Sequence, residues 1–117
     1  MAETTKSEQR STLDVVFTAS ATSDPVRIAD KDIIGIRLPA GEITAATLTF
    51  QGGRHENDTF LDVRRPSDAA LVTVTVNGNQ DWYPIEPSDL YGVGPYVRVV
   101  SNASSTGTIQ LIVRAIG

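Results

Sequence analysis

The sequence contains no cysteine. Disulfide bonds, thiolate zinc sites and thiol nucleophiles are therefore excluded together. Stability has to come from packing and strand pairing instead, and a chain of 117 residues is long enough to bury a core without such cross-links. We therefore expect one domain.

Long apolar segments and an excess of positive charge are also missing. No stretch approaches the roughly 18 apolar residues of a membrane-spanning helix, and the first dozen residues lack the apolar region of a signal peptide. The 10 Lys and Arg residues are outnumbered by 14 Asp and Glu, which gives a net charge of −4. We therefore expect a protein made in a cytoplasm, with neither a membrane nor a nucleic acid as partner.

What the sequence does contain is short runs in which apolar and polar residues alternate. Val72, Val74 and Val76 share one face of a strand that leads into Asn77-Gly78, a dipeptide typical of tight hairpin turns. Residues 81–85 are then expected to be the hairpin partner of residues 71–76. Similar runs recur at intervals of about ten residues, separated by turn residues; they cover 13–17, 26–29, 33–38, 46–51, 59–64, 96–101 and 108–116.

These runs predict an all-β fold: a single-domain antiparallel β-sandwich or jelly-roll of about eight or nine short strands over residues 12–117. Residues 1–11 are polar and are expected to form a flexible N-terminal arm. Residues 102–107 are expected to be a turn-rich linker between the last two strands, and residues 88–90 one helical turn.

Two strands are apolar on both faces. In the strand 33–38, the pattern places Ile34, Ile36 and Leu38 on one face and Ile33 on the other, and Ile112 likewise points opposite to its core-facing neighbours. In the strand 59–64, Leu61 is expected to share a face with Val63. Strands that are apolar on both faces suggest burial on both faces and hence an oligomer.

Two groups of residues could carry chemistry, and each has a simpler interpretation. His55 lies in a loop with Glu56 and Asp58, which could serve as a base or metal site, but polar residues are common at loop tips of any sandwich. The segment 77–81 carries alternating oxygen ligands, as many calcium loops do, but lacks the distal glutamate and is better explained as a turn. We therefore predict no catalytic residue, no cofactor and no metal site, and do not expect an enzyme.

The aromatic side chains gather in one region. Trp82, Tyr83, Tyr91 and Tyr96 could close an open end of the sandwich, form a protein interface or stack on a glycan. Arg98 is one of several arginines on or beside predicted strands, either on a solvated face or at an interface with another subunit. These five residues are the candidate interface.

The segment from Asp32 to Ile116 resembles a group of small phage and prophage proteins encoded among virion structural genes. The resemblance lies in strand and turn residues, together with a glycine-rich loop before Phe60: Ile33-Ile-Gly-Ile-Arg-Leu-Pro-Ala40, Ala46-Thr-Leu-Thr-Phe-Gln51, Trp82-Tyr-Pro-Ile-Glu-Pro87, Leu90-Tyr-Gly92, Val97-Arg-Val-Val-Ser101 and Ile109-Gln-Leu-Ile-Val-Arg114.

The resemblance implies a structural role in the virion of a tailed phage. Proteins of this kind decorate or cement the capsid by binding neighbouring capsid subunits, often as trimers. The partners implied are the major capsid protein or another virion protein, together with further copies of the chain. The alternative is a tail- or fibre-associated module that recognises a glycan or another ligand on the host surface. The resemblance carries no active-site residue over to this chain.

Overall fold

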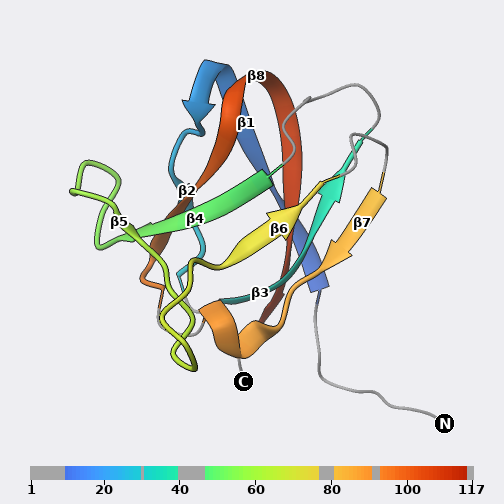
Figure 1. Cartoon of the computed structure of the whole chain (residues 1–117). Coiled ribbons are helices and arrows are strands. Elements are labelled where there is room, and N and C mark those ends of the chain that lie inside the picture. The colour runs from blue at the N-terminus through green and yellow to red at the C-terminus, as the bar shows by residue number, and fades with distance from the viewer. Residues whose placement is uncertain (1–9, 30, 40–46, 77–80, 91–92, 116–117) are drawn as a thin grey trace, which may run out of the picture.

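The computed structural model describes residues 10–29, 31–39, 47–76, 81–90 and 93–115. These residues form eight antiparallel strands and one short 3-10 helix, which confirms the predicted all-β fold (Figure 1). The elements are β1 (Arg10–Thr22), β2 (Val26–Arg27), β3 (Lys31–Leu38), β4 (Thr47–Gly53), β5 (Leu61–Asp62), β6 (Thr73–Thr75), β7 (Asp81–Pro84), η1 (Pro87–Leu90) and β8 (Tyr96–Ala115). The expected boundary of the arm at residue 11 falls inside β1, which begins at Arg10.

The strands form two layers that share β8. In the first, the β7 layer, the C-terminal part of β8 lies between β1 and β3, and β7 pairs with β3. In the second, the β4 layer, the N-terminal part of β8 lies between β2 and β4, and β5 and β6 both pair with β4. Figure 1 shows β8 bending over at the top of the molecule with β1 alongside it.

The predicted linker at residues 102–107 is wrong, because these residues belong to β8. The pairing with β1 continues on both sides of the bend, with Ser20 opposite Ser105 and Thr22 opposite Val100, and the register shifts between them. Three residues of β1, Ser20 to Thr22, therefore lie opposite six residues of β8, Val100 to Ser105. The turn-forming residues of this segment are used for a bulge in a paired strand, because β1 supplies a partner where the sequence suggested a chain reversal.

The predicted hairpin between residues 71–76 and 81–85 is also wrong. Strand β6 pairs with β4, with Thr73 opposite Thr49, whereas β7 pairs with β3, with Trp82 opposite Arg37. The chain therefore passes from the β4 layer to the β7 layer between β6 and β7; Asn77-Gly78 lies outside the described residues. The faces were predicted correctly, because alternation fixes which side chains are buried but not which strand becomes the neighbour.

A bulge in β3 changes the faces predicted for that strand. The register between β3 and β8 shifts between Ile33 and Gly35, so Ile33 joins Ile36 and Leu38 in the core. Ile34 is only half-buried. The prediction that Leu61, now in β5, shares a face with Val63 is wrong as well. Leu61 is 69% exposed, whereas the neighbouring Phe60 is 7% exposed and Val63 packs against the core.

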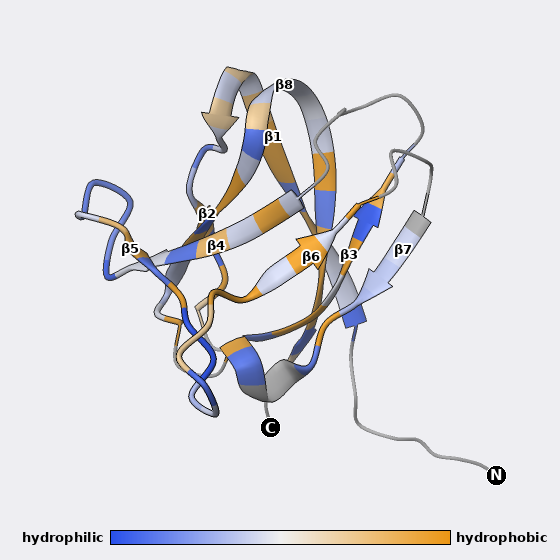
Figure 2. Cartoon of the chain, in the orientation of Figure 1, coloured by the Kyte–Doolittle hydropathy of each residue, from blue (hydrophilic) through white to orange (hydrophobic). Residues whose placement is uncertain are grey.

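The core lies between the two layers. The β7 layer contributes side chains such as Phe17, Ile36 and Leu111, and the β4 layer contributes Leu48 and Phe50, all of them at most 3% exposed. Figure 2 shows apolar and polar segments alternating along these strands. No helix in the described ranges is long and apolar enough to cross a membrane.

Candidate functional site

An exposed tryptophan marks the outer face of the β7 layer. Trp82 is 57% exposed, although it is the bulkiest side chain of the sequence, whereas the next residue, Tyr83, packs against the core. The two side chains point to opposite faces because successive residues of a strand alternate. Of the four aromatic residues of the predicted interface, Tyr83 therefore lies on the inner side and Trp82 on the outer.

The indole of Trp82 lies over a glycine. A Cβ atom on Gly35 would be 3.4 Å from Trp82 Nε1, 3.6 Å from Ile112 Cγ1 and 3.2 Å from the backbone oxygen of Tyr83. Ile112 is only 3% exposed although it lies outside the core cluster, and its Cγ1 and the indole nitrogen both lie close to the position that a Cβ atom on Gly35 would take. The missing side chain at position 35 thus lets the indole lie close to the sheet, which holds a large apolar surface in a fixed place.

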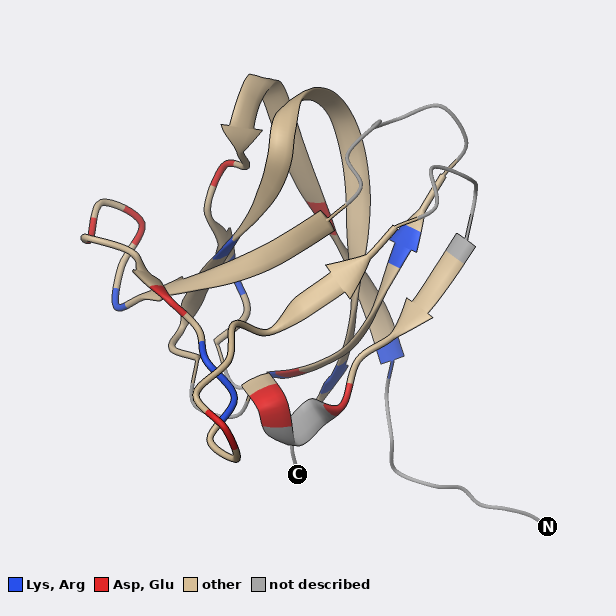
Figure 3. Ribbon diagram, in the orientation of Figure 1, with Lys and Arg blue, Asp and Glu red and all other residues tan. Residues whose placement is uncertain are grey.

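A shallow depression adjoins the indole. We call it the Trp82 surface; its lining residues are Arg10, Ile34, Trp82, Pro84, Ile85, Ile112 and Arg114. Its lining side chains are apolar apart from two arginines, while polar atoms contribute more of its exposed surface than apolar atoms do. Figure 3 shows positively charged segments at the start of β1 and near the end of β8, where these arginines belong. Tryptophan and arginine are both enriched at protein interfaces.

The arginines of this face are held by polar neighbours. Arg114 forms an ion pair with Asp32, with 3.3 Å between Nη2 and Oδ2. Arg37, directly opposite Trp82 on β3, donates from Nη1 to Gln110 Oε1 at 2.6 Å, and Gln110 donates to Asp14 Oδ1 at 3.2 Å. The guanidinium groups are thus positioned across three neighbouring strands before any partner arrives.

Arg98 and Tyr96, two further residues of the predicted interface, lie elsewhere. Arg98 belongs to the β4 layer, where its guanidinium carbon stands 4.6 Å from the centre of the Phe60 ring and its Nε donates to Gln51 Oε1 at 2.7 Å. Tyr96 is half-buried at the start of β8 and pairs with Gly53. Tyr91 lies outside the described residues. The structure therefore does not bring Arg98 or Tyr96 together with Trp82.

The residues around His55 form a loop that is closed by an ion pair. Arg54 Nε and Asp58 Oδ2 are 3.1 Å apart, and the Asp58 carboxylate also accepts from the backbone N–H groups of Arg54 at 2.7 Å and Thr59 at 2.9 Å. The hydrogen bond from the Arg54 side chain, followed by those from the backbone, lowers the pKa of Asp58 well below its usual range. Asp58 is thus engaged in holding the loop, and His55 is exposed.

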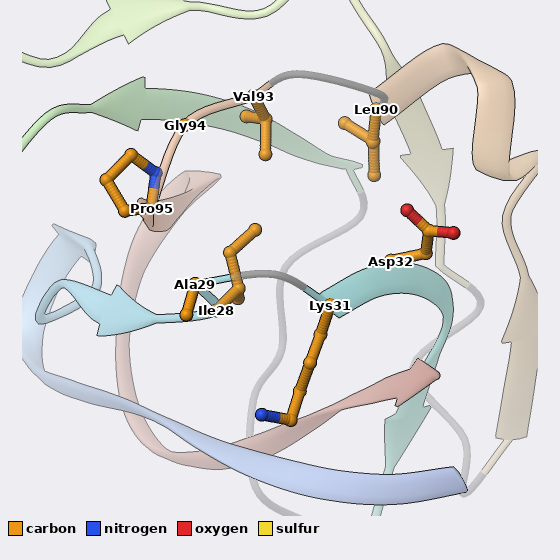
Figure 4. Close-up of a pocket in the computed structure, with 8 residues that line it drawn as sticks. All are labelled: Ile28, Ala29, Lys31, Asp32, Leu90, Val93, Gly94 and Pro95. Carbon is orange, nitrogen blue, oxygen red and sulfur yellow. The ribbon is translucent and has the colours of Figure 1, made fainter. Parts of the chain in front are cut away.

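Among the described residues, no polar groups converge in the pocket between the β2–β3 turn and the segment after η1. Leu90, Val93 and Ile28 point toward one another in Figure 4, while the side chain of Lys31 extends away from them. Asp32, which also lines this pocket, is paired with Arg114. The described part of the pocket is therefore an apolar seam without a convergent set of acid, base or nucleophile.

Within the described ranges, no group of three or more His, Asp and Glu residues lies close enough together to hold a metal ion. Residues 77–80 of the segment weighed as a calcium loop lie outside the described part of the chain.

Most of the Trp82 surface does not follow from the sequence pattern, which places Arg10 in the arm and Ile34 and Ile85 at ordinary strand positions. Ile112 is the available signal, because an isoleucine that points opposite to its core-facing neighbours suggests burial on a second face. The pattern does not bring Trp82 near it, since the pairing of β3 with β7 cannot be read from the sequence.

No family model matches the chain, and no curated protein matches its sequence. Among solved structures, the crystal structure of the SPBc2 prophage-derived protein YomS is similar to it, with a TM-score of 0.52 and 13% sequence identity. The similarity covers 97% of this chain and 100% of that one. At this identity the match establishes the fold, and it extends over nearly the whole length of this chain and the whole length of the other.

Proposed function

We propose that this chain is a structural protein of a tailed-phage virion, which decorates or cements the capsid by binding neighbouring capsid subunits. The observation that carries the proposal is the similarity in fold, over nearly the full length of this chain and the full length of the other, to a protein derived from a prophage. The resemblance of residues 32–116 to proteins encoded among virion structural genes supports the same role. The proposed location is the virion, after assembly in the bacterial cytoplasm.

The physical properties of the domain suit this role. The body is a two-layered β-fold, and it presents an exposed tryptophan with positioned arginines on one outer face. A decoration protein binds through its surface and needs no reaction centre. We therefore propose that the chain is not an enzyme, that it has the major capsid protein or another virion protein as partner, and that it acts as a homo-oligomer, with the trimer taken from the resemblance.

A tail- or fibre-associated module that binds a glycan is the second candidate. One observation favours it: the exposed indole of Trp82 could stack on a sugar ring. Against it, the lining of the Trp82 surface offers isoleucine, proline and arginine rather than the amides and carboxylates that bind sugar hydroxyls. Glycan-array binding that is lost in Trp82→Ala would favour this candidate.

The proposal is tested by locating the chain in particles from the bacterium that carries its gene. After induction or infection, purified particles are labelled with an antibody against the chain and imaged by electron microscopy, with particles from a gene deletion as control. We expect label over the capsid. Label confined to the tail would favour the second candidate, and particles without label would overturn a virion role altogether.

A further inference from the structure

We propose that the Trp82 surface is the docking site for a segment of a partner protein in which a carboxylate side chain stands beside an aliphatic one. The proposal rests on the proposed function, because it names the part of the chain that would contact another virion protein. Three features support the proposal: the exposed indole of Trp82, the arginines around it and the backbone groups at the edge of β7.

The apolar part of the site is already in place. Trp82 lies over Gly35 and beside Ile112, so its indole is positioned by the sheet and still exposes more than half of its surface. A partner side chain that covers the indole needs little ordering of Trp82, because its ring is placed in advance. Tryptophan held in this way is among the residues that contribute most to protein interfaces.

The charge around the indole selects the partner. Arg10 and Arg114 line the depression, and Arg37 stands opposite Trp82 on the neighbouring strand. The chain as a whole carries a net charge of −4, so a site whose lining charges are both positive differs from the average surface. A guanidinium has five N–H donors and can bind a further carboxylate while it keeps an existing partner. Charge complementarity therefore points to an acidic side chain on the partner.

The partner is expected to cover the face of β7 rather than to extend the sheet. The backbone N–H of Ile85 donates to Ile34 O at 3.0 Å, so Ile85 points its backbone groups toward β3. Backbone groups alternate in direction along a strand, and those of Trp82 and Pro84 therefore point toward the free edge of β7. Pro84 has no N–H group to offer there. In the described part of β7, strand addition would therefore find one N–H donor, at Trp82, which is too few for a stable ladder.

The chemistry of the site can be measured without particles, because Trp82 is the single tryptophan of the chain. The full chain is labelled with 5-fluorotryptophan and titrated with a capped peptide of alternating leucine and aspartate, followed by fluorine NMR. The control peptide replaces each aspartate by asparagine. We expect a saturable shift with the acidic peptide and binding at least about tenfold weaker with the amide peptide, as expected when a carboxylate loses a paired guanidinium.

Matched variants localise the effect. Arg114→Gln and Arg37→Gln should each weaken binding of the acidic peptide severalfold, whereas Arg27→Gln makes the same change of charge on β2 and should not. Binding of unlabelled Trp82→Ala, followed by calorimetry, should be lost, and Leu61→Ala serves as control because Leu61 is the other strongly exposed apolar residue, at 69%, in the β4 layer. Each variant is first checked for an unchanged melting temperature.

Several results would overturn the proposal. The fluorine signal could fail to respond to the acidic peptide, or it could respond equally to both peptides. It could respond to oligosaccharides instead. It could also shift with the concentration of the chain alone, which would indicate a second copy as occupant. The proposed function is tested separately by the antibody label on particles. A chain found on capsids whose Trp82 signal ignores the acidic peptide would retain the virion role and lose this docking site.

Discussion

At the residue scale, the Trp82 surface depends on Gly35. A side chain at this position would stand 3.2 Å from a backbone oxygen and 3.4 Å from the indole nitrogen, closer than most such contacts. The sheet cannot move far at this point, because β3 is paired on both sides, with β7 and with β8. The indole is the neighbour that can move.

Gly35→Ala is therefore expected to lift the indole away from the sheet. The substitution should cost about 1 kcal/mol of folding free energy, at the low end for overpacking, because an exposed ring can yield. Tryptophan emission should move to longer wavelength and acrylamide should quench it more strongly, since the single tryptophan reports on this site alone. A Gly35→Ala variant with the emission and quenching of the wild type would contradict the close packing of indole and glycine.

Asp58 provides a pH-dependent contribution to stability at the same scale. Its pKa is lowered in the folded chain, first by the hydrogen bond from the Arg54 side chain. A carboxyl with a depressed folded pKa stabilises the fold above its unfolded pKa of about 3.9, and that contribution is lost as the pH falls below this value.

Asp58→Asn should consequently lower the melting temperature at pH 7, and its difference from the wild type should shrink between pH 5 and pH 3. Thermal unfolding measured across this range checks the expectation. Glu56→Gln is the matched control, because Glu56 is exposed in the same loop, and it should follow the wild type throughout. A difference between Asp58→Asn and wild type that stays constant with pH would argue against the ion pair with Arg54.

At the element scale, side-chain faces were easier to predict than strand partners. Val72, Val74 and Val76 are buried as their alternation predicts. Their alternation holds no information on the neighbour, however, and Asn77-Gly78 suggested a local partner where the fold uses two distant ones. In β3, the bulge between Ile33 and Gly35 exchanged the faces of Ile33 and Ile34, and nothing in a run of apolar residues marks where such a bulge falls.

The candidate site was foreseen only in part for the same reason. Trp82 was a candidate interface residue because of its residue type alone. Its surroundings depend on which strands flank it: β3 brings Gly35 and Arg37, and β8 brings Ile112 and Arg114. These pairings join residues that are far apart in the sequence, so a single sequence without its fold could not assemble them.

Engineered disulfides can test whether β6 pairs with β4, as in the structure, or with β7, as in a direct hairpin. The test is clean because the chain has no cysteine of its own. Thr49→Cys with Thr73→Cys places two thiols on opposed residues of β4 and β6, at a spacing that a disulfide can bridge. Val72→Cys with Tyr83→Cys places them where a direct hairpin with Asn77-Gly78 as its turn would have opposed them. Mild oxidation should close the first pair and leave the second reduced; the reverse outcome would restore the hairpin.

At the scale of the whole molecule, the start of β1 determines how the N-terminal segment can be tested. Arg10 and Ser11 pair with Arg114 and Val113, so a deletion that includes them would damage the sheet and the Trp82 surface together. Deletion of residues 1–9 leaves β1 complete. This shorter deletion tests the contribution of the N-terminal segment without changing the folded domain.

If the N-terminal segment helps to hold the chain on the capsid, deletion of residues 1–9 should reduce the number of copies per particle without changing the melting temperature. Quantitative mass spectrometry of particles made with each form measures the occupancy. Full occupancy with the deleted form would assign attachment to the folded body alone. A fall in melting temperature would instead show that the segment stabilises the domain.

For the molecule as a whole, we propose that the chain attaches to the capsid through the face that carries Trp82. The most direct measurement is a cryo-electron microscopy difference map between particles with and without the gene. We expect additional density on the capsid exterior that fits a body of 47 × 31 × 28 Å, with the outer face of the β7 layer turned toward the capsid subunits. Difference density on the tail, or none on the particle, would contradict this account.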